Sequence, residues 1–456
     1  MKASVYRTSK SSDQYLQLID QLQTRQEIEY EDTLMQKKFD TEHKLINLHP
    51  QVTFQQIEGI GGALTESAAY AWSKLGEENR KKFVQMYFDA EEGIGYTLGR
   101  FCMGSSDFSI DEYTYVEEGD MDLSTFDLSR EDKYVIPLAK AALEYSPELK
   151  FFFAPWSPPK YMKDVDHVQG GHLKKEFYGL YAEYFAKYVR EMQRRDIPIW
   201  VATVQNETRH HQTWESCCYT PAQEKEFVTE YLGPALDELG IKIMFYDHCK
   251  ERVFERCQYM YEDPETAKYL YGIACHWYSG DHFGELQLAK QMYPDKGIIM
   301  TECCTADGDV GLKITNDLAH AEKYAHDLLG NLNAGLTGYT DWNIALDEVN
   351  GPYHNRAGHC AAPIICDSVN DQILCQSSYY YIGHFSKFIR PGAKRIGSSC
   401  YTDLLEVTSF VNPDGKLATV VLNRSEQELT YILRIKGQLL DRVIPPHSIE
   451  TVILEA

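Results

Sequence analysis

The sequence predicts a (β/α)8 TIM barrel, an α/β fold, with a smaller antiparallel β side domain. Three observations predict it. Short apolar runs alternate with longer amphipathic stretches, there are eight such runs, and from about residue 393 the pattern changes to short alternating strands. The 456 residues are ample for a barrel of this kind, which often spans about 250 residues or more as one unit.

The eight predicted barrel strands are apolar or β-branched runs that end in polar or glycine-rich residues. They cover residues 53–64, 95–103, 149–156, 198–206, 241–248, 271–278, 297–302 and 335–342. Stretches with helical spacing lie between and after them, at residues 77–89, 131–145, 174–195, 221–237, 264–270, 284–292, 314–332 and 374–388. Strands and helices that alternate in this number are typical of the closed barrel.

The C-terminal region has short strands of alternating hydrophobicity with turn signals such as NPDG at 412–415. The runs are GAKRIGSS, LLEVTSFVN, LATVVLNRS, LTYILRIK and SIETVILE. The first 50 residues or so have no barrel strand, so we expect them to supply strands such as QEIEYED to the same domain. The predicted domains are an N-terminal β segment (1–52), the barrel (53–390) and the β side domain (391–456).

The charge balance argues against a partner that is a nucleic acid or an anionic membrane. Lys and Arg number 45 against 68 Asp and Glu, a formal net charge of −23, whereas both partners require a positive surface. No apolar run approaches the ~20 residues of a membrane span, and the N-terminus has no apolar signal-peptide core. We therefore expect a cytoplasmic protein without stable membrane association. The sequence leaves the oligomeric state open.

The twelve cysteines and fifteen histidines have no metal-binding spacing. There is no C-x-x-C, no H-x-H and no H-E-x-x-H. Thiols in a chain without a signal peptide are expected to be reduced and buried as small apolar groups. We expect no metal ion and no cofactor.

Two glutamates occupy the positions where a barrel enzyme carries its chemistry, the C-terminal ends of strands. Glu207 and Glu302 end the fourth and seventh predicted strands, which lie across the barrel mouth from each other. Two facing carboxylates are what glycoside cleavage needs, one to attack the anomeric carbon and one to protonate the leaving oxygen. Aromatic residues at other strand ends would form the walls of a sugar pocket: Trp156, Trp277, Tyr278 and Trp342. Alone, each glutamate would more often be a surface charge or a helix N-terminal partner than a catalytic group.

At these residues the sequence resembles glycoside hydrolase family 30, the family of lysosomal glucosylceramidase and its bacterial relatives. The similar segments occur in the family's order from about residue 54 to residue 425. They are GIGGALTESAA (59–69), EEGIGYTLGRFCMGSSDFS (91–109), FFFAPWSPPKYMK (151–163), VATVQNE (201–207), GIACHWY (272–278), TEC (301–303), GYTDWN (338–343), YYYIGHFSKFI (379–389) and VVLNRS (420–425).

The resemblance implies a retaining mechanism with Glu302 as nucleophile and Glu207 as acid/base. It implies a sugar-binding site that contains Arg100, Asp107, Phe108, Trp156, Asn206, His276, Tyr278 and Trp342. In that site Asp107 would hold the outer hydroxyls of the sugar and Asn206 its 2-hydroxyl. Arg100 would help keep the nucleophile ionised, because an opposite charge in reach lowers a carboxylate pKa.

The leading hypothesis is an enzyme that removes terminal β-linked glucosyl units by double displacement. β-1,6-Glucanase, β-xylosidase and β-fucosidase activities stay open, as does a non-catalytic sugar-binding role on the same barrel. A metal-dependent barrel hydrolase is disfavoured by the missing histidine pair after the first strand. Two loops depart from the family's pattern and leave the aglycone open: 208–214 lacks a proline after the acid/base, and 351–360 has Asn355 near the family's sugar-facing asparagine.

Overall fold

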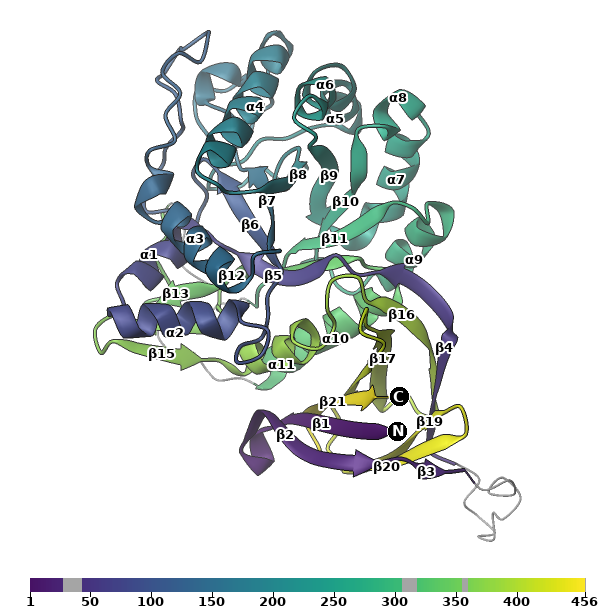
Figure 1. Ribbon diagram of the computed structural model, residues 1–456. Helices are drawn as coiled ribbons and strands as arrows, with labels where there is room; N and C mark the ends of the chain where they lie inside the picture. The colour runs from purple at the N-terminus through teal and green to yellow at the C-terminus, as the bar shows by residue number, and fades with distance from the viewer. Residues whose placement is uncertain (28–42, 306–317, 355–359, 456) are drawn as a thin grey trace. The chain divides into compact units, whose positions relative to one another are not determined.

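The computed structural model describes residues 1–27, 43–305, 318–354 and 360–455 (Figure 1). The chain divides into two compact units, one made of Met1–Gly59, Asn316–Thr337 and Ser377–Ala456, the other of Ile60–Thr315 and Gly338–Gln376. A closed barrel of eight parallel strands and a sheet that combines strands from both chain ends confirm the predicted fold class. The domain bounds at 52 and 390 stay a prediction.

The barrel strands follow one another in chain order, and the last returns to the first, so every strand edge is paired. They are β5 (Gly59–Ala63), β6 (Leu98–Met103), β7 (Lys150–Pro155), β8 (Ile199–Thr203), β9 (Lys242–Cys249), β10 (Leu270–His276), β11 (Gly297–Glu302) and β12 (Gly338–Asn343). All eight overlap the predicted runs. The first run needs a correction, because residues 53–56 belong to β4 (Leu45–Gln56) of the other sheet and the barrel strand begins only at Gly59.

One cluster of buried apolar side chains comes from the barrel strands. It consists of one residue from each of five consecutive strands: Phe152, Val201, Met244, Ala274 and Ile299. Large apolar side chains at this level make the barrel a packed core and not a pore. A ligand site must therefore lie above this cluster, at the C-terminal ends of the strands.

Amphipathic helices follow the strands in the unit that contains the barrel (Figure 1). In the longest of them, Tyr181, Phe185, Tyr188 and Met192 are buried, and their spacing places them on one face. The helices are α1 (Glu66–Ser73), α2 (Glu77–Phe88), α3 (Val135–Tyr145), α4 (Tyr178–Arg194), α5 (Pro221–Phe227), α6 (Gly233–Asp237), α7 (Val253–Tyr261), α8 (Pro264–Ala267) and α9 (Phe283–Met292). Neither α1 nor α7 was among the predicted helices, nor was a small sheet of β13 (Ala345–Asp347), β14 (Ile364–Asp367) and β15 (Gln372–Cys375).

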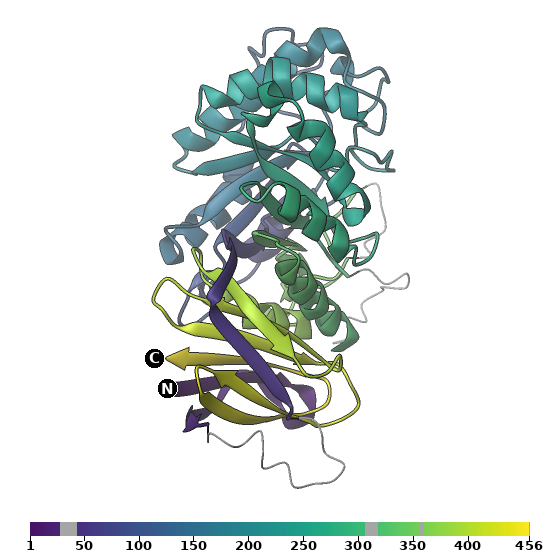
Figure 2. The same ribbon diagram turned by 90° about the vertical axis from the view of Figure 1, so that its right-hand side faces the viewer.

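The other unit contains a ten-stranded sheet in the order β2-β1-β21-β18-β17-β16-β4-β19-β20-β3. Besides β4, its strands are β1 (Lys2–Ser9), β2 (Gln14–Gln23), β3 (Arg25–Gln26), β16 (Lys394–Cys400), β17 (Leu405–Val411), β18 (Leu417–Asn423), β19 (Leu429–Ile435), β20 (Gln438–Ile444) and β21 (Ser448–Glu455). Strands β1 and β21 pair antiparallel along their whole length, from Lys2 opposite Glu455 to Ser9 opposite Ser448. Figures 1 and 2 show the two chain ends side by side as a result.

Two helices belong to the same unit, α10 (Leu318–Asn333) and α11 (Ser377–Ser386). The buried His384 of α11 hydrogen-bonds Thr8 of β1 at 2.9 Å and Thr451 of β21 at 2.8 Å, so the helix is joined to both terminal strands. Strand β20 was not predicted, and of the segment QEIEYED only its first two residues lie within the described part of the chain. In that part, no helix combines the length and apolar character that a membrane span needs.

Candidate active site

A cavity of about 240 Å³ lies at the C-terminal ends of the barrel strands. Its walls are Asp107, Trp156, Asn206, Glu207, His210, Gln212, Trp214, Cys249, Tyr278, Glu302, Cys304, Trp342 and Cys360. Seven of the ten predicted site residues are among them. The other three, Arg100, Phe108 and His276, have no exposed surface and do not line the cavity. Trp277, expected as a wall, is also buried and donates to the carbonyl of Cys304 at 3.1 Å.

The two glutamates face each other across the cavity. Glu207 follows β8, Glu302 ends β11, and a carboxylate oxygen of each lies within 4.8 Å of the other. Glu207 has a left-handed backbone (φ 53°), a conformation that is uncommon for any residue but glycine. Its amide donates to the carbonyl oxygen of Asp247 at 2.8 Å. This hydrogen bond holds the strained residue in place.

Arg100, fully buried on β6, connects three polar side chains of the site. Its Nη1 donates to Glu302 at 2.7 Å. Its Nη2 donates to the amide oxygen of Asn206 at 2.8 Å and to Asp247 at 3.0 Å. Because a guanidinium only donates, these bonds fix the amide oxygen of Asn206 toward Arg100 and leave its NH2 end to reach other groups. The guanidinium thus orients both carboxylates and the amide.

Asp247 is the site residue that sequence reasoning missed. Its Oδ2 accepts hydrogen bonds from Thr203 at 2.9 Å and from Arg100. Its Oδ1 accepts a hydrogen bond from Thr301 and lies 3.0 Å from Nε2 of His276. Burial alone would raise the pKa of this carboxyl, but the charge of Arg100 and the hydrogen bonds from His276 and Thr301 hold it well below its usual value. Asp247 is therefore a buried carboxylate between two cationic side chains.

A β-bulge explains how Asp247 reaches this position. On the neighbouring strand, Ala274 pairs with Tyr246 and the next residue, Cys275, pairs with His248, so Asp247 is an extra residue in the register. Tyr246 and Asp247 both have left-handed backbone, with φ of 76° and 43°. The one available signal is that the fifth apolar run ends in Asp247 and His248, the same kind of polar strand end that identified Glu207 and Glu302.

His276 is enclosed by carboxylates. Its Nδ1 lies 3.6 Å from Glu207, and its Nε2 lies 3.0 Å from Asp247. Burial lowers the pKa of this imidazole, but the charge of Glu302, the hydrogen bond to Asp247 and the nearby carboxylate of Glu207 outweigh burial and raise it to about 9. His276 is therefore an imidazolium at neutral pH.

The surroundings of Glu207 favour its charged form. Burial would raise its pKa, yet the rings of His210 and His276, 3.7 Å and 3.6 Å away, and the nearby positive charge hold the pKa well below the usual value. Gln212 also donates to Oε2 of Glu207 at 2.7 Å. Glu207 and His276 therefore interact as a pair, and their protons belong to the pair and not to either residue alone.

Aromatic rings form the side of the cavity nearest Arg100. Trp156 and Trp342 stack with ring centroids 5.2 Å apart and planes 19° from parallel. The guanidinium of Arg100 lies 4.9 Å and 5.3 Å from these two centroids, and the edge-to-face contact of Phe108 supports Trp342 from behind. Tyr278 donates its hydroxyl to Oε1 of Glu302 at 2.9 Å. These rings offer the apolar faces that sugar C–H groups need.

The described start of the second departing loop, residues 351–354, lies beside Asp107. The amide of His354 donates to the backbone carbonyl of Asp107 at 3.1 Å, and its ring lies 2.8 Å from Glu215. Burial lowers the pKa of His354, but the bonds to Glu215 and to the carbonyl of Ser109 raise it to about 9. Asn355 lies outside the described residues, so its role stays a prediction.

Two sets of side chains at the cavity could hold a metal ion, because their donor atoms lie within 4.8 Å of one another. One set is Glu207, His210 and His248, and the other is Glu207, His276 and Glu302. Burial lowers the pKa of His248 to about 3, so its ring is neutral at any ordinary pH.

Two family models match the chain: the glycosyl hydrolase family 30 TIM-barrel domain over residues 57–389 and the glycosyl hydrolase family 30 beta sandwich domain over residues 392–452. Lysosomal acid glucosylceramidase from Mus musculus is 33% identical over 433 residues, 89% of this chain and 82% of that protein. Among solved structures, SrfJ from Salmonella typhimurium covers 100% of both chains with a TM-score of 0.92 at 33% identity. The endo-β1,6-glucanase BT3312 covers 99% of both with a TM-score of 0.87 at 27% identity. The chain belongs to glycosyl hydrolase family 30 and is a glycoside hydrolase with a carbohydrate substrate.

Proposed function

We propose that the protein is a retaining β-glucosidase that removes terminal glucosyl units, with Glu302 as nucleophile and Glu207 as acid/base. The separation of the two carboxylates carries the proposal. Retaining enzymes hold their carboxyl groups about 5–5.5 Å apart, whereas inverting enzymes need roughly 6.5–9.5 Å to admit a water molecule. Carboxylate oxygens within 4.8 Å of each other support double displacement.

In the first step Glu302 attacks the anomeric carbon while the bond from that carbon to the leaving oxygen breaks. Both oxygens of Glu302 are oriented for this attack, Oε2 by Arg100 at 2.7 Å and Oε1 by Tyr278 at 2.9 Å. In the second step water, activated by Glu207, attacks the same carbon and releases Glu302. The sugar therefore leaves with its original configuration.

The pair of Glu207 and His276 supplies the proton for the leaving oxygen. The Nδ1 of His276 lies 3.6 Å from Oε1 of Glu207, near enough for the two charges to be coupled, and Glu207 lines the cavity while His276 does not. We assign the transfer to Glu207 for that reason. His276 acts as a positioning residue that keeps the proton close to Glu207.

The small cavity supports action on one terminal sugar. Its volume of about 240 Å³ lies below the roughly 300–1,000 Å³ of most ligand sites. Asp107 and the NH2 end of Asn206 would bind hydroxyl groups, and Trp156 would stack against the ring. The resemblance to a glucosylceramidase supports glucose as that sugar. Xylose and fucose differ from glucose in few contacts and are the nearest competitors.

A second candidate is an endo-acting β-1,6-glucanase. The likeness to the endo-β1,6-glucanase BT3312, which extends over 99% of both chains, favours it. An endo-acting enzyme would bind sugars on both sides of the cleaved bond. Its best substrate would therefore be a polymer and not an aryl glycoside.

The test is release of 4-nitrophenol from a panel of aryl β-glycosides that includes the glucoside, xyloside and fucoside. Three proteins are compared: wild type, Glu302→Gln, and Glu251→Gln as a control at a glutamate that pairs with Arg209 and does not line the cavity. We expect glucoside turnover in the wild type and the control and none in Glu302→Gln. Turnover retained by Glu302→Gln would refute the nucleophile assignment, and hydrolysis of β-1,6-glucan alone would establish the second candidate.

A further inference from the structure

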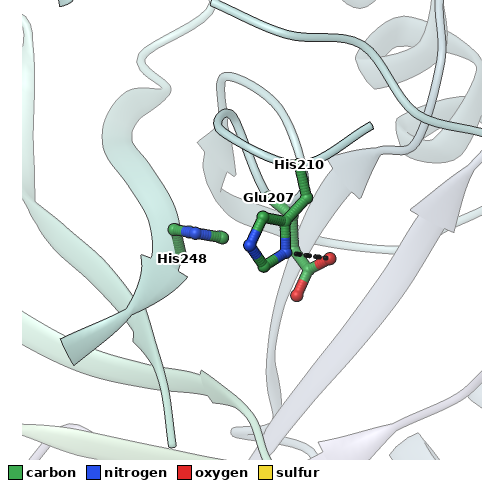
Figure 3. Close-up of side chains that lie close together, drawn as sticks. All are labelled: Glu207, His210 and His248. Carbon is green, nitrogen blue, oxygen red and sulfur yellow. Dashed lines mark ion pairs between the residues drawn. The ribbon is translucent and has the colours of Figure 1, made fainter. Parts of the chain in front are cut away.

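We propose that Glu207, His210 and His248 bind a divalent transition-metal ion of the zinc class, and that the bound ion blocks hydrolysis. Each side chain brings one donor atom within 4.8 Å of the other two. Figure 3 shows the ring of His210 between the carboxylate of Glu207 and the ring of His248. The two histidine rings are nearly perpendicular, with centroids 4.3 Å apart.

One ring nitrogen of the buried His248 lacks a hydrogen-bond partner within the described part of the chain, which also supports the site. This residue is 1% exposed, and its Nδ1 has no hydrogen-bond partner among the residues that the structure describes. Buried polar atoms are almost always hydrogen-bonded, so this ring has bonding capacity left that a bound ligand could use. The bulge at Tyr246 and Asp247 directly precedes His248 and fixes its place beside Glu207.

The donor set selects the class of metal. Two imidazoles and one carboxylate suit Zn²⁺, Co²⁺ or Ni²⁺, whereas Mg²⁺ and Ca²⁺ prefer oxygen donors alone. Zinc–nitrogen bonds of about 2.0–2.1 Å require the donors to move inward. The side chain of His210 is 50% exposed and can rotate, while Glu207 and His248 are buried and set the position of the ion.

The rival set of Glu207, His276 and Glu302 is a poorer site for a cation. Arg100 places its positive charge 2.7 Å from Glu302, and His276 already lies 3.0 Å from Asp247. A metal ion there would meet the repulsion of the guanidinium and would have to break both contacts. The set that contains His210 and His248 lies away from this guanidinium, and the contact that a metal ion would replace there is the hydrogen bond from Gln212 to Glu207.

Binding of the metal does not depend on the proposed function, but its inhibitory effect does. A Glu207 carboxylate that coordinates a cation has no proton to give to the leaving oxygen, and the ion occupies one wall of the sugar cavity. Micromolar free metal would then switch off the wild-type enzyme reversibly, and a chelator would restore it.

Direct binding is measured first, without reference to activity. Zn²⁺ alone is titrated into the wild type by calorimetry, and Co²⁺ alone is followed by its visible absorption. His210→Ala and His248→Gln should each weaken binding at least 10-fold. His211→Ala, at the exposed neighbouring histidine outside the set, should leave the affinity unchanged.

Three results would overturn the proposal. Equal affinity in His210→Ala and wild type would exclude the site. A thiolate-to-cobalt charge-transfer band would place the ion on cysteines such as Cys249 or Cys304, which also line the cavity. Stoichiometric binding with full activity would overturn the inhibitory role. If no glycoside is cleaved at all, calorimetry still decides the metal site.

Discussion

The backbone amide of Glu207 donates a hydrogen bond to the carbonyl oxygen of Asp247, 2.8 Å away, and both residues have left-handed backbone. Such backbone costs roughly 1–3 kcal/mol at a residue other than glycine and persists only where the surroundings enforce it. Here the hydrogen bond joins the residue after β8 to the bulge of β9, so each segment stabilises the left-handed backbone of the other. The position of the proposed acid/base therefore depends on a residue that does not line the cavity.

Asp247→Asn should impair both stability and activity, because the amide cannot balance the buried charges of Arg100 and His276. Removing one partner from a buried ion pair costs about 3 kcal/mol or more. We expect a loss of that size in the unfolding free energy, measured with denaturant, and a kcat on aryl glucoside about 100-fold lower. Thr203→Val removes one hydrogen bond to the same carboxylate and should cost about 1 kcal/mol. Equal effects of the two variants would contradict the charge-based explanation.

Glu207→Ala should separate the two chemical steps. A good leaving group needs no proton, so the first step should survive on dinitrophenyl glucoside while the second slows by about 100-fold or more. Azide should then accelerate turnover and yield the β-glucosyl azide, identified by NMR. In Glu302→Ala the same anion would attack from the opposite face and yield the α-anomer. If azide had no effect on Glu207→Ala, another residue would be the base.

Gly61→Ala should disrupt the barrel at its first strand pair. A Cβ at Gly61 would lie 1.8 Å from the carbonyl oxygen of Leu98, its partner on β6. The backbone must move apart, and we expect a loss above about 3 kcal/mol or no soluble protein. Gly284→Ala in α9 meets no atom within 4 Å and should gain up to about 1 kcal/mol of stability. Denaturant unfolding of both variants checks the contrast.

Glu131 should make the protein less stable as pH rises from 4.5 to 7. This carboxyl is 3% exposed, accepts hydrogen bonds from Tyr113 and Tyr115, and has its pKa raised by burial from 4.5 to about 7. In that window the native state keeps a proton that the unfolded state has lost, so the unfolding free energy falls with pH, by about 3 kcal/mol in total. Glu131→Gln should remove this slope, measured by denaturant unfolding across the window. Glu112 is exposed, so Glu112→Gln should retain the pH dependence of the unfolding free energy. A slope that persists in Glu131→Gln would assign the effect to another group.

The eight barrel strands could be predicted from the sequence because buried parallel strands are continuous apolar runs that end abruptly in polar residues. Glu207 and Glu302 were found by that rule. Asp247 and the approach of His210 to His248 were not found. The polar end of the fifth run points to Asp247 and His248, but their positions depend on the extra residue in β9, and no local pattern marks a bulge. Strand β20 was missed because Asp441 and Arg442 interrupt its apolar pattern. Cys304 is buried in a hydrophobic cluster, as expected for these thiols, and it also lines the cavity, which the sequence did not predict.

The pairing of β1 with β21 has a consequence for biosynthesis. Strand β1 leaves the ribosome before all the barrel strands, whereas its partner β21 leaves after all of them. During that interval Ala3 and Val5 lack the partner strand that covers them in the finished sheet, and one edge of β1 is open to pairing with other chains. The ten-stranded sheet can therefore be completed only after all eight barrel strands have been synthesised, and slow or interrupted translation should expose the nascent chain to aggregation at this edge first.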